Sequence, residues 1–245
     1  MNTFPRKFNR LSYILLMIIS LAFDLNYVHA MECEIIEVDR RYPAHIASFK
    51  PSYVRRLTQE EMERRKVSET KAKGIVGEKL SRFVIESDIR LGDQKLVSMF
   101  TYFENMGCNI TPYLRSNADQ GIDDVFVVLT KDGRINRSYN PLFHEAKYNG
   151  SCNLRLSTTK TICDQLSFQW IEHNLKKAHK RIITGGDICF GTRNGAKITP
   201  CFSCKTQFQE EFSWLASKLN AGHFHRTASV LCADGQLKIY NVEGR

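Results

Sequence analysis

The chain has 245 residues and a formal net charge of +9, with 42% hydrophobic and 25% charged residues. This length and composition exclude wholesale disorder and predict one domain of ordinary size, with or without an extension. The basic surplus favours an anionic partner, either nucleic acid or an anionic membrane, without choosing between them.

Residues 1–30 predict a secretory signal peptide. A basic start precedes the apolar run LSYILLMIISLAF, and VHA follows, so we expect cleavage after Ala30. The run is shorter than the roughly 20 residues that span a bilayer, so we expect no stable membrane insertion; an uncleaved anchor is the alternative. Cleavage removes three basic residues and one acidic residue, which leaves a charge of +7. The predicted location is therefore secreted or periplasmic.

All eight cysteines lie beyond this signal peptide. An even number of cysteines in an exported chain predicts disulfides, although spacing does not give their pairing. The alternative is a zinc site at Cys201 and Cys204, completed by one or more of Cys189, His223, His225 and Cys232. The sequence has no second pair of ligands at standard zinc spacing, which favours disulfides.

In chain order, residues 31–57 predict an irregular N-terminal extension, and the domain is expected over residues 58–245. Thr58 with Glu61 three residues later indicates a helix start. Apolar residues then recur at helical spacing, at Ile75, Val76, Leu80, Phe83 and Val84. The other side of this helix carries Gly74, Gly77, Glu78 and Ser81. These small residues predict that the helix approaches another element closely and presents the Glu78 carboxylate there.

Residues 96–103 and 125–130 have the pattern of strands, and Asp132-Gly133 predicts a hairpin turn into a strand over 141–148. On that strand Glu145 and Lys147 share one face, while His144 faces the other way and is expected to pack. A simple two-residue turn would set Glu145 opposite Gln120. Glu145 lies at the level of Asp123 only if a bulge or a wider loop takes up three more residues, which we expect within residues 135–141.

Residues 157–181 predict a helix with Gln165, Gln169, Glu172 and Lys176 on one face. A second amphipathic helix is expected around residues 208–219, ended by Gly222. The chain then closes with a hairpin that turns at Asp234-Gly235. The predicted fold class is α/β, with a central mixed sheet flanked by helices.

Acidic residues on two neighbouring strands can form a magnesium site, because this ion prefers oxygen ligands and leaves positions for water and phosphate. Such an ion neutralises charge on a phosphodiester and activates water. Lys147 points the same way as Glu145, so its ammonium can stabilise developing negative charge. Asp123 and Asp124 face opposite sides of their strand, so only one of them can be a ligand.

The order of these features resembles the restriction-endonuclease-like phosphodiesterases, the PD-(D/E)xK superfamily. The stretches GIDDVF, HEAKYN and DQLSFQWI are similar to the nuclease domains at the C-termini of bacterial polymorphic toxins, and the resemblance covers roughly residues 70–242. Ile122 stands where the motif has its proline. The resemblance implies a restriction-endonuclease-like sheet and a nuclease that uses Mg²⁺ or Mn²⁺. It implies that the ligands are Asp123 and Glu145 with support from Glu78, that Lys147 is the catalytic lysine, and that Gln165, Ser167 and Trp170 match the helix that follows.

We therefore expect an exported nuclease, a toxin or effector, with DNA or RNA as substrate and with a possible acidic immunity or inhibitor protein as partner. Ser167 and a basic cluster at a helix end are expected to contact the substrate, and this cluster consists of Lys176, Lys177, Lys180 and Arg181. Cations also suit a helix C-terminus without any substrate. Trp170 is expected in the core. Two alternatives are a non-enzymatic, disulfide-stabilised secreted effector that binds an anionic partner, and a nucleic-acid binder that has lost catalysis.

Overall fold

A computed structural model describes residues 33–108, 110, 114, 121–159, 162–184 and 202–244. The predicted signal peptide lies outside these residues. The compact unit begins at Glu34. Its helices are α2 (Pro51–Arg65), α3 (Glu69–Asp88), α4 (Met99–Asn105), α6 (Phe168–Thr184) and α7 (Phe202–Asn220). None of the helices within the described residues combines the length and the apolar character needed to cross a bilayer.

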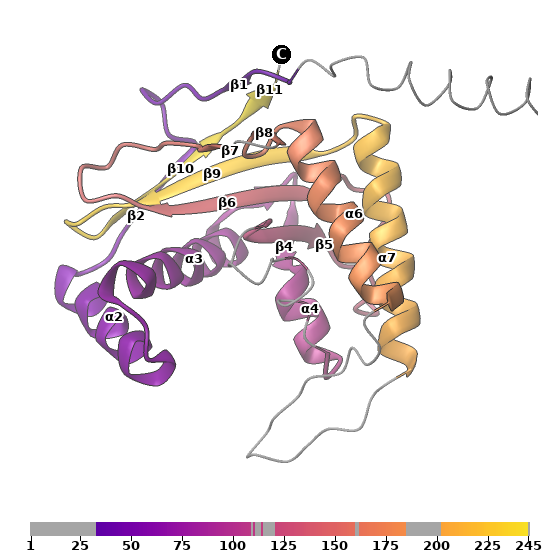
Figure 1. Ribbon diagram of the computed structural model, residues 1–245, viewed down its shortest axis with the longest axis horizontal. Coiled ribbons are helices and arrows are strands. Elements are labelled where there is room, and N and C mark those ends of the chain that lie inside the picture. Colours follow the sequence, from indigo (N-terminus) through magenta and orange to yellow (C-terminus); the bar gives the residue numbers. More distant parts are fainter. Residues whose placement is uncertain are drawn as a thin grey trace, which may run out of the picture. The chain divides into compact units, whose positions relative to one another are not determined.

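A seven-stranded sheet forms the centre of the unit, in the order β2-β10-β9-β6-β5-β4-β3 (Figure 1). Its strands are β2 (His45–Ser48), β3 (Arg90–Leu91), β4 (Gln94–Ser98), β5 (Asp124–Val128), β6 (Leu142–Tyr148), β9 (His225–Leu231) and β10 (Gln236–Asn241). Strands β6 and β9 pair in parallel, and the other neighbours are antiparallel. The predicted α/β class with a mixed sheet flanked by helices is confirmed.

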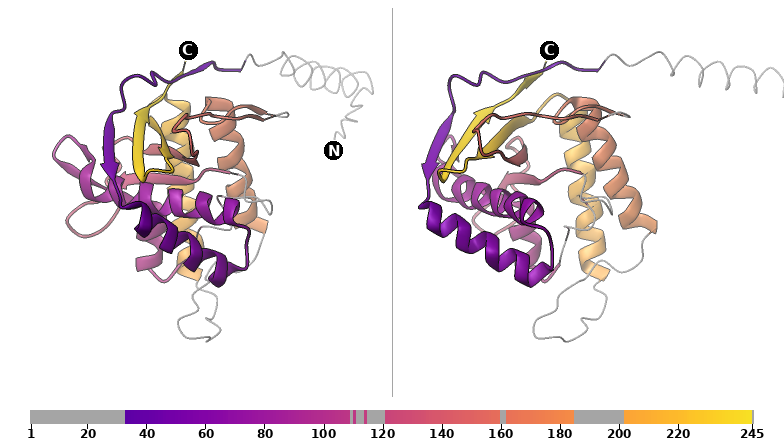
Figure 2. Two further views of the ribbon diagram at one scale, coloured as in Figure 1. Left: turned by 90° about the vertical axis from the view of Figure 1, so that its left-hand side faces the viewer. Right: turned by 60° about the vertical axis from the view of Figure 1, so that its left-hand side comes forward.

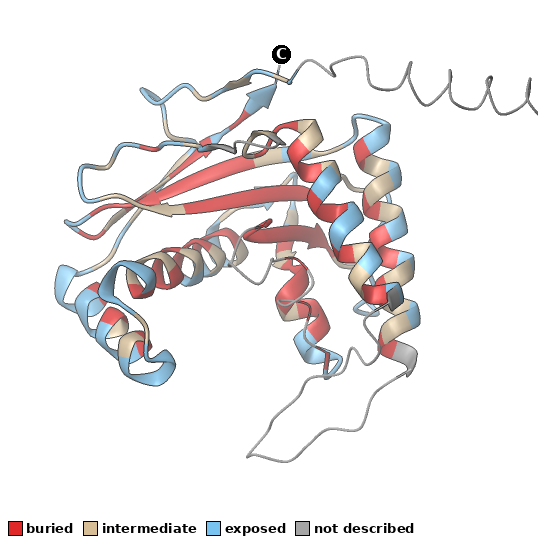
Figure 3. Cartoon of the chain, in the orientation of Figure 1, coloured by how far each residue is buried: buried red, intermediate tan, exposed pale blue. Residues whose placement is uncertain are grey.

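Both faces of the sheet are covered, and each cover encloses its own apolar core. One core joins α2 and α3 to Phe126, Leu142 and Ile239 of the sheet. The other core joins α4, α6 and α7 to Val125, Phe143 and other residues of the opposite face. Figure 2 shows α2 beside α3 and α6 beside α7, and Figure 3 shows that the central strands are buried. Charged groups on these strands therefore need partners within the fold.

Residues 34–57 belong to the fold, so the prediction of an irregular extension over 31–57 was wrong for them; residues 31 and 32 lie outside the described residues. Strand β1 (Ile36–Glu37) pairs with β11 (Glu243–Gly244), and β2 pairs with β10 at the edge of the sheet. Helix α2 begins at Pro51, not at Thr58, because proline suits the first helical position. Thr58 lies inside α2, where its hydroxyl donates to the Val54 carbonyl.

Two further elements differ from their predictions. Residues 96–103 do not form one strand, because the Ser98 side chain accepts from the Phe100 N–H and starts α4 there. The helix expected from residue 157 begins at Phe168. Before it, β7 (Thr158–Thr159) pairs with β8 (Ile162–Asp164), as β-branched residues favour.

The cysteines are disulfide-bonded wherever the structure describes them. Cys108 pairs with Cys204 and Cys152 pairs with Cys232, while Cys33 and Cys163 are also disulfide-bonded. The zinc alternative is therefore wrong, because Cys204 and Cys232 have no free thiolates to offer; Cys189 and Cys201 lie outside the described residues. Disulfides fit an extracellular or otherwise oxidising compartment.

Candidate active site

The pairing of β5 with β6 brings the predicted acidic residues together. A simple turn would set Asp124 opposite Pro141, but Asp124 pairs with His144, a shift of three residues. Thr130 and Arg134 close the turn around Gly133, and the extra residues lie between Ile135 and Leu142. Asp123, one residue before β5, thus lies at the level of Glu145. The expected register shift is confirmed.

Asp123 is tied directly to β6. Its Oδ2 atom accepts a hydrogen bond of 2.8 Å from the Ala146 N–H. Asp123 and Glu145 are both buried, and the register of β5 and β6 sets these two acidic residues at the same level of the sheet. Two neighbouring acids repel each other unless cations offset their charge.

Lys147 supplies one such charge. Its Nζ lies 2.6 Å from Glu145 Oε1, and Gln165 Nε2 donates to the same oxygen at 2.5 Å. Burial lowers the pKa of Lys147, but the nearby carboxylates of Glu145, Asp123 and Glu78 outweigh this and raise it overall. The structure thus brings Asp123, Glu145, Lys147 and Gln165 together, with Glu78 close enough to act on the Lys147 charge.

Helix α3 approaches β6 as its small residues predicted. A Cβ atom on Gly77 would lie 3.4 Å from the Lys147 carbonyl oxygen, so the helix and the strand are in contact there. Gly74 has open space around it, and Phe83 is exposed, not part of the apolar side as expected. Glu78 follows Gly77 directly, and its carboxylate lies close enough to raise the pKa of Lys147.

Asp124 faces the opposite side and is fully engaged there. It accepts from Arg82 Nε at 2.6 Å, from the Ser98 hydroxyl at 2.7 Å and from the Val125 N–H at 2.8 Å. Burial raises the pKa of Asp124 to about 6, although Arg82 and these hydrogen bonds oppose the shift. The two adjacent aspartates thus have different surroundings. Asp123 lies on the side of Glu145, and Asp124 forms a structural ion pair with Arg82.

His144 also lies on that opposite side. Its ring nitrogens contact the hydroxyls of Thr227 and Ser229 at 2.9 and 3.0 Å, and Ser229 in turn contacts Ser81 of α3. Burial, aided by the Arg82 charge, lowers the pKa of His144 to about 3. A neutral, fully hydrogen-bonded histidine links β6, β9 and α3, as the expected packing role requires.

The residues before and in α6 divide between the site and the core. Gln165 precedes the helix, so the predicted shared helical face with Gln169 was wrong, yet its amide reaches Glu145 from the loop. Ser167 is fully buried and its hydroxyl accepts from the Trp170 N–H, which supports a positioning role in place of the expected substrate contact. Trp170 is buried in the core, as expected.

The basic cluster lies in the C-terminal half of α6, whereas Asp123 lies just before β5 and Glu145 lies in β6. Lys176, Lys177 and Lys180 are exposed, Arg181 is half-buried, and Lys176 pairs with Glu172 at 2.6 Å. Their contact with substrate stays a prediction.

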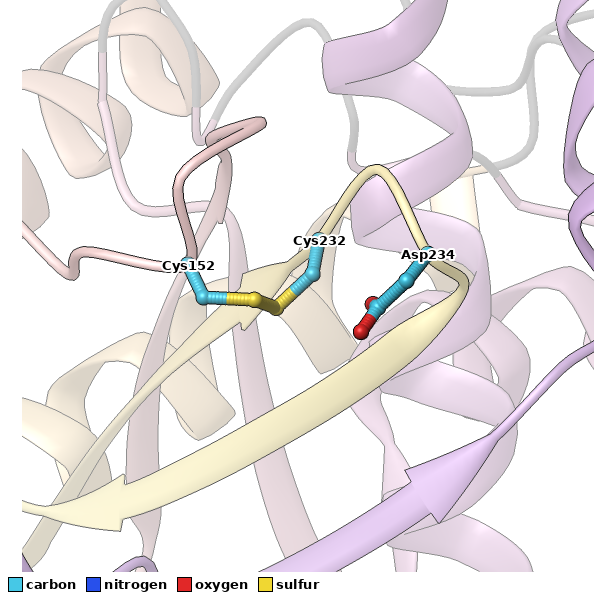
Figure 4. A group of neighbouring side chains, drawn as sticks. All are labelled: Cys152, Cys232 and Asp234. Atoms are coloured by element: carbon cyan, nitrogen blue, oxygen red, sulfur yellow. A yellow bond between two sulfur atoms is a disulfide. The ribbon is translucent and has the colours of Figure 1, made fainter.

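The donor chemistry of the site fits a hard divalent cation. Asp123 and Glu145 offer carboxylate oxygens, which Mg²⁺ and Mn²⁺ prefer. Another cluster with possible metal ligands consists of Cys152, Cys232 and Asp234 (Figure 4). Its two sulfur atoms are bonded to one another, so this cluster offers no thiolates and we assign it to the disulfide.

Arg82 and Ser98 hold Asp124 on the face opposite the candidate site, and neither was predicted from the sequence. The sequence did contain a signal for Arg82. This residue lies one helical turn after Glu78, and Asp124 needs a cation as its partner once it is buried. Ser98 gave no such signal, since it lies in what reads as a strand.

Comparison of the chain with models of protein families, with curated proteins and with solved structures found no match.

Proposed function

We propose that the chain is a metal-dependent nuclease that hydrolyses phosphodiester bonds of DNA or RNA. The observation that supports this best is the convergence of Asp123, Glu145 and Lys147. The register of β5 and β6 sets the two acids side by side, and Lys147 Nζ lies 2.6 Å from Glu145. The same residues carry the resemblance to the PD-(D/E)xK nucleases.

In this proposal Asp123 and Glu145 hold Mg²⁺ or Mn²⁺, with Glu78 in support. When bound, such an ion neutralises phosphate charge and lowers the pKa of a bound water. Lys147 carries a positive charge at neutral pH and stabilises the negative charge that develops on the phosphate. Gln165 keeps the Glu145 carboxylate in one orientation through its hydrogen bond of 2.5 Å.

We further propose that the protein is exported through residues 1–30 and acts as a toxin or effector. The disulfides and the N-terminal sequence pattern support export. A nuclease outside its producer spares the producer's own nucleic acid. The basic surplus favours nucleic acid as substrate, and it suits an acidic inhibitor protein as a protective partner.

The second candidate is a non-enzymatic, disulfide-stabilised effector that binds an anionic partner. The disulfides favour it, since they stabilise a secreted chain with or without catalysis. It predicts that replacement of Asp123 or Glu145 leaves the biological effect unchanged.

The test is cleavage of plasmid DNA and of tRNA by the purified protein with magnesium, with a chelator, and with Lys147→Ala. We expect cleavage that needs the metal and that falls about 100-fold or more in Lys147→Ala. Lys95→Ala is the matched control, because Lys95 is an exposed lysine on β4. Cleavage by Lys147→Ala at the rate of Lys95→Ala would refute the proposal.

A further inference from the structure

The Gln165 side chain reaches Glu145 from the end of the strand pair β7 and β8, and hydrogen bonds to Ser157 hold it there. The Gln165 N–H donates to the Ser157 carbonyl at 3.1 Å, and the Ser157 N–H donates to Gln165 Oε1 at 2.9 Å. The same side-chain amide donates to Glu145 through Nε2. A movement of Ser157 is therefore transmitted to the Glu145 carboxylate, because one planar amide group joins them.

A disulfide anchors the connection that leads from β6 to Ser157. Cys152 lies in this connection and is bonded to Cys232, which follows β9 directly (Figure 4). Residues 152–157 belong to no helix or strand, and Leu154 holds their middle in the core. The disulfide is thus a covalent anchor, five residues before Ser157, for a segment that has no regular secondary structure.

The backbone of Cys152 depends on this anchor. Its φ is +58°, in the left-handed region that disfavours residues with a side chain. Such a conformation persists when the surrounding structure fixes it. The Cys152 N–H donates to the Asn149 carbonyl at 2.9 Å, and the bond to Cys232 fixes the side chain. Loss of the disulfide removes one of these constraints, so we expect the connection to rearrange.

The Cys152–Cys232 and Cys108–Cys204 disulfides differ in how a thiol in solution can reach them. Cys108 and Cys204 are both buried, with 1% and 2% exposure, so the fold shields both sulfur atoms. Cys232 is also buried, but Cys152 is half-buried. A thiolate can therefore attack at Cys152, because disulfide exchange requires access to one sulfur of the bond.

We propose that the Cys152–Cys232 disulfide is a redox-sensitive element that controls the proposed metal site through Gln165. When it is reduced, the connection no longer holds Ser157, so Gln165 releases Glu145 and the site binds Mg²⁺ or Mn²⁺ less tightly. This inference rests on the proposed function, because that function makes Glu145 a metal ligand. It restricts full activity to an oxidising compartment and keeps the chain weakly active in a reducing cytoplasm before export.

A dithiol can carry out this reduction. One thiolate of the dithiol attacks the Cys152 sulfur, and Cys232 leaves as a thiolate that takes up a proton. The second thiol of the reductant then displaces Cys152, which takes up the other proton. The protein gains two electrons and two protons, and the dithiol becomes a disulfide.

The experiment compares the wild-type chain with two double variants, Cys152→Ser/Cys232→Ser and Cys108→Ser/Cys204→Ser. The second is the matched control, because the two disulfides span 80 and 96 residues of sequence and their removal has a similar chain-entropy cost. Mn²⁺ affinity is measured directly by isothermal titration calorimetry, and cleavage is measured at each magnesium concentration.

We expect Cys152→Ser/Cys232→Ser to raise the dissociation constant for Mn²⁺ by about 10-fold, as Gln165→Leu should, and Cys108→Ser/Cys204→Ser to leave it unchanged. In a Gln165→Leu background, loss of the Cys152–Cys232 disulfide should have no further effect on Mn²⁺ affinity, because the contact that couples them is already absent. Equal Mn²⁺ affinities in the two double variants would overturn the inference.

A second measurement uses the wild-type chain and does not depend on the folding of any variant. The chain is treated with increasing amounts of a dithiol, its thiols are alkylated and mapped by mass spectrometry, and the reductant is removed before the Mn²⁺ titration. Thiols should appear at Cys152 and Cys232 before they appear at Cys108 and Cys204, and the Mn²⁺ affinity should fall in step. Unchanged affinity after reduction of Cys152 and Cys232 would overturn the inference.

Cys163 is also disulfide-bonded and lies two residues before Gln165, so the same maps must follow it. A fall in Mn²⁺ affinity that follows the Cys163 thiol instead of the Cys152 thiol would also overturn the inference.

The inference and the proposed function fail in different ways. Magnesium-dependent cleavage by the wild-type chain, with equal Mn²⁺ affinities in the two double variants, would refute the redox control and leave the nuclease. Disulfide-dependent Mn²⁺ binding without cleavage of DNA or RNA would refute the nuclease and leave a redox-sensitive metal site. Absence of Mn²⁺ binding by the wild-type chain would refute both.

Discussion

Gln165 Nε2 and Lys147 Nζ both contact Glu145 Oε1, at 2.5 and 2.6 Å. One donor comes from the strand that carries the glutamate and the other from the loop before α6. The Glu145 carboxylate is therefore held from two sides before any substrate arrives, and such positioning suits the proposed metal ligand.

Gln165→Leu should weaken the affinity for the metal that cleavage needs, without unfolding the protein. Hydrogen-bond partners of a metal ligand typically contribute 10–100-fold to metal affinity or activity. We expect the magnesium concentration for half-maximal cleavage to rise by about 10-fold. Gln169→Leu is the control, because Gln169 lies in α6 and contacts the Glu34 N–H instead. Identical magnesium titrations for the two variants would contradict this role for Gln165.

The adjacent aspartates should separate activity from stability. Asp123→Ala should reduce cleavage more than about 100-fold, because it removes a proposed metal ligand and not merely a partner of one. Asp124→Ala should instead lower the free energy of unfolding by about 1–3 kcal/mol, because it leaves Arg82 and the Ser98 hydroxyl without their acceptor. Cleavage rates and urea unfolding of both variants check this, and the reverse pattern would assign the ligand to Asp124.

The two glycines of α3 should respond differently to larger side chains. Gly74→Ala should raise the free energy of unfolding by up to about 1 kcal/mol, because open space surrounds Gly74 and alanine favours helix. Gly77→Leu should lower it by about 1–3 kcal/mol and reduce cleavage, because the side chain meets the Lys147 carbonyl. Gly77→Ala, which makes only an ordinary contact, is the control. Full cleavage by Gly77→Leu would show that α3 need not touch β6.

Local signals in the sequence predict the site better than they predict the pairing of distant segments. The alternation of strand side chains predicted that Asp123 and Asp124 face opposite sides. Pro141 and its neighbours predicted where the register shifts. Both predictions rest on local signals. The wrong prediction of an irregular N-terminal segment concerns long-range pairing. Strand β2 forms by pairing with β10, nearly the whole unit away in sequence, and nothing within residues 31–57 shows that partner. The Gln165 contact likewise depends on how a loop folds back on β6.

A pH-dependent contribution to stability is expected from Glu61, away from the site. Burial raises the pKa of Glu61, but Arg64 and Lys79 donate to its carboxylate and lower the pKa overall to about 2, from an ordinary value of 4.5. A lowered pKa means that the stabilisation is complete above pH 4.5 and is lost as the pH falls towards 2.

Glu61→Gln should therefore unfold more easily than the wild type near neutral pH, by about 1–3 kcal/mol, and the difference should shrink below pH 4.5. Urea unfolding at several pH values measures this. Glu63→Gln, an exposed change in the same helix, should have little effect. A Glu61→Gln deficit that stays constant down to pH 2 would argue against the ion pairs of Glu61 with Arg64 and Lys79.

The central claim is tested most directly by one comparison of cleavage rates, between Glu145→Gln and Glu211→Gln. Both glutamates are buried, with 2% and 3% exposure, and each accepts a hydrogen bond of 2.5 Å from a glutamine and pairs with a cation. Both variants should therefore carry a similar structural cost. We predict that Glu145→Gln loses magnesium-dependent cleavage by about 100-fold or more while Glu211→Gln retains it. Equal rates in the two variants would contradict a metal-dependent nuclease site at Glu145.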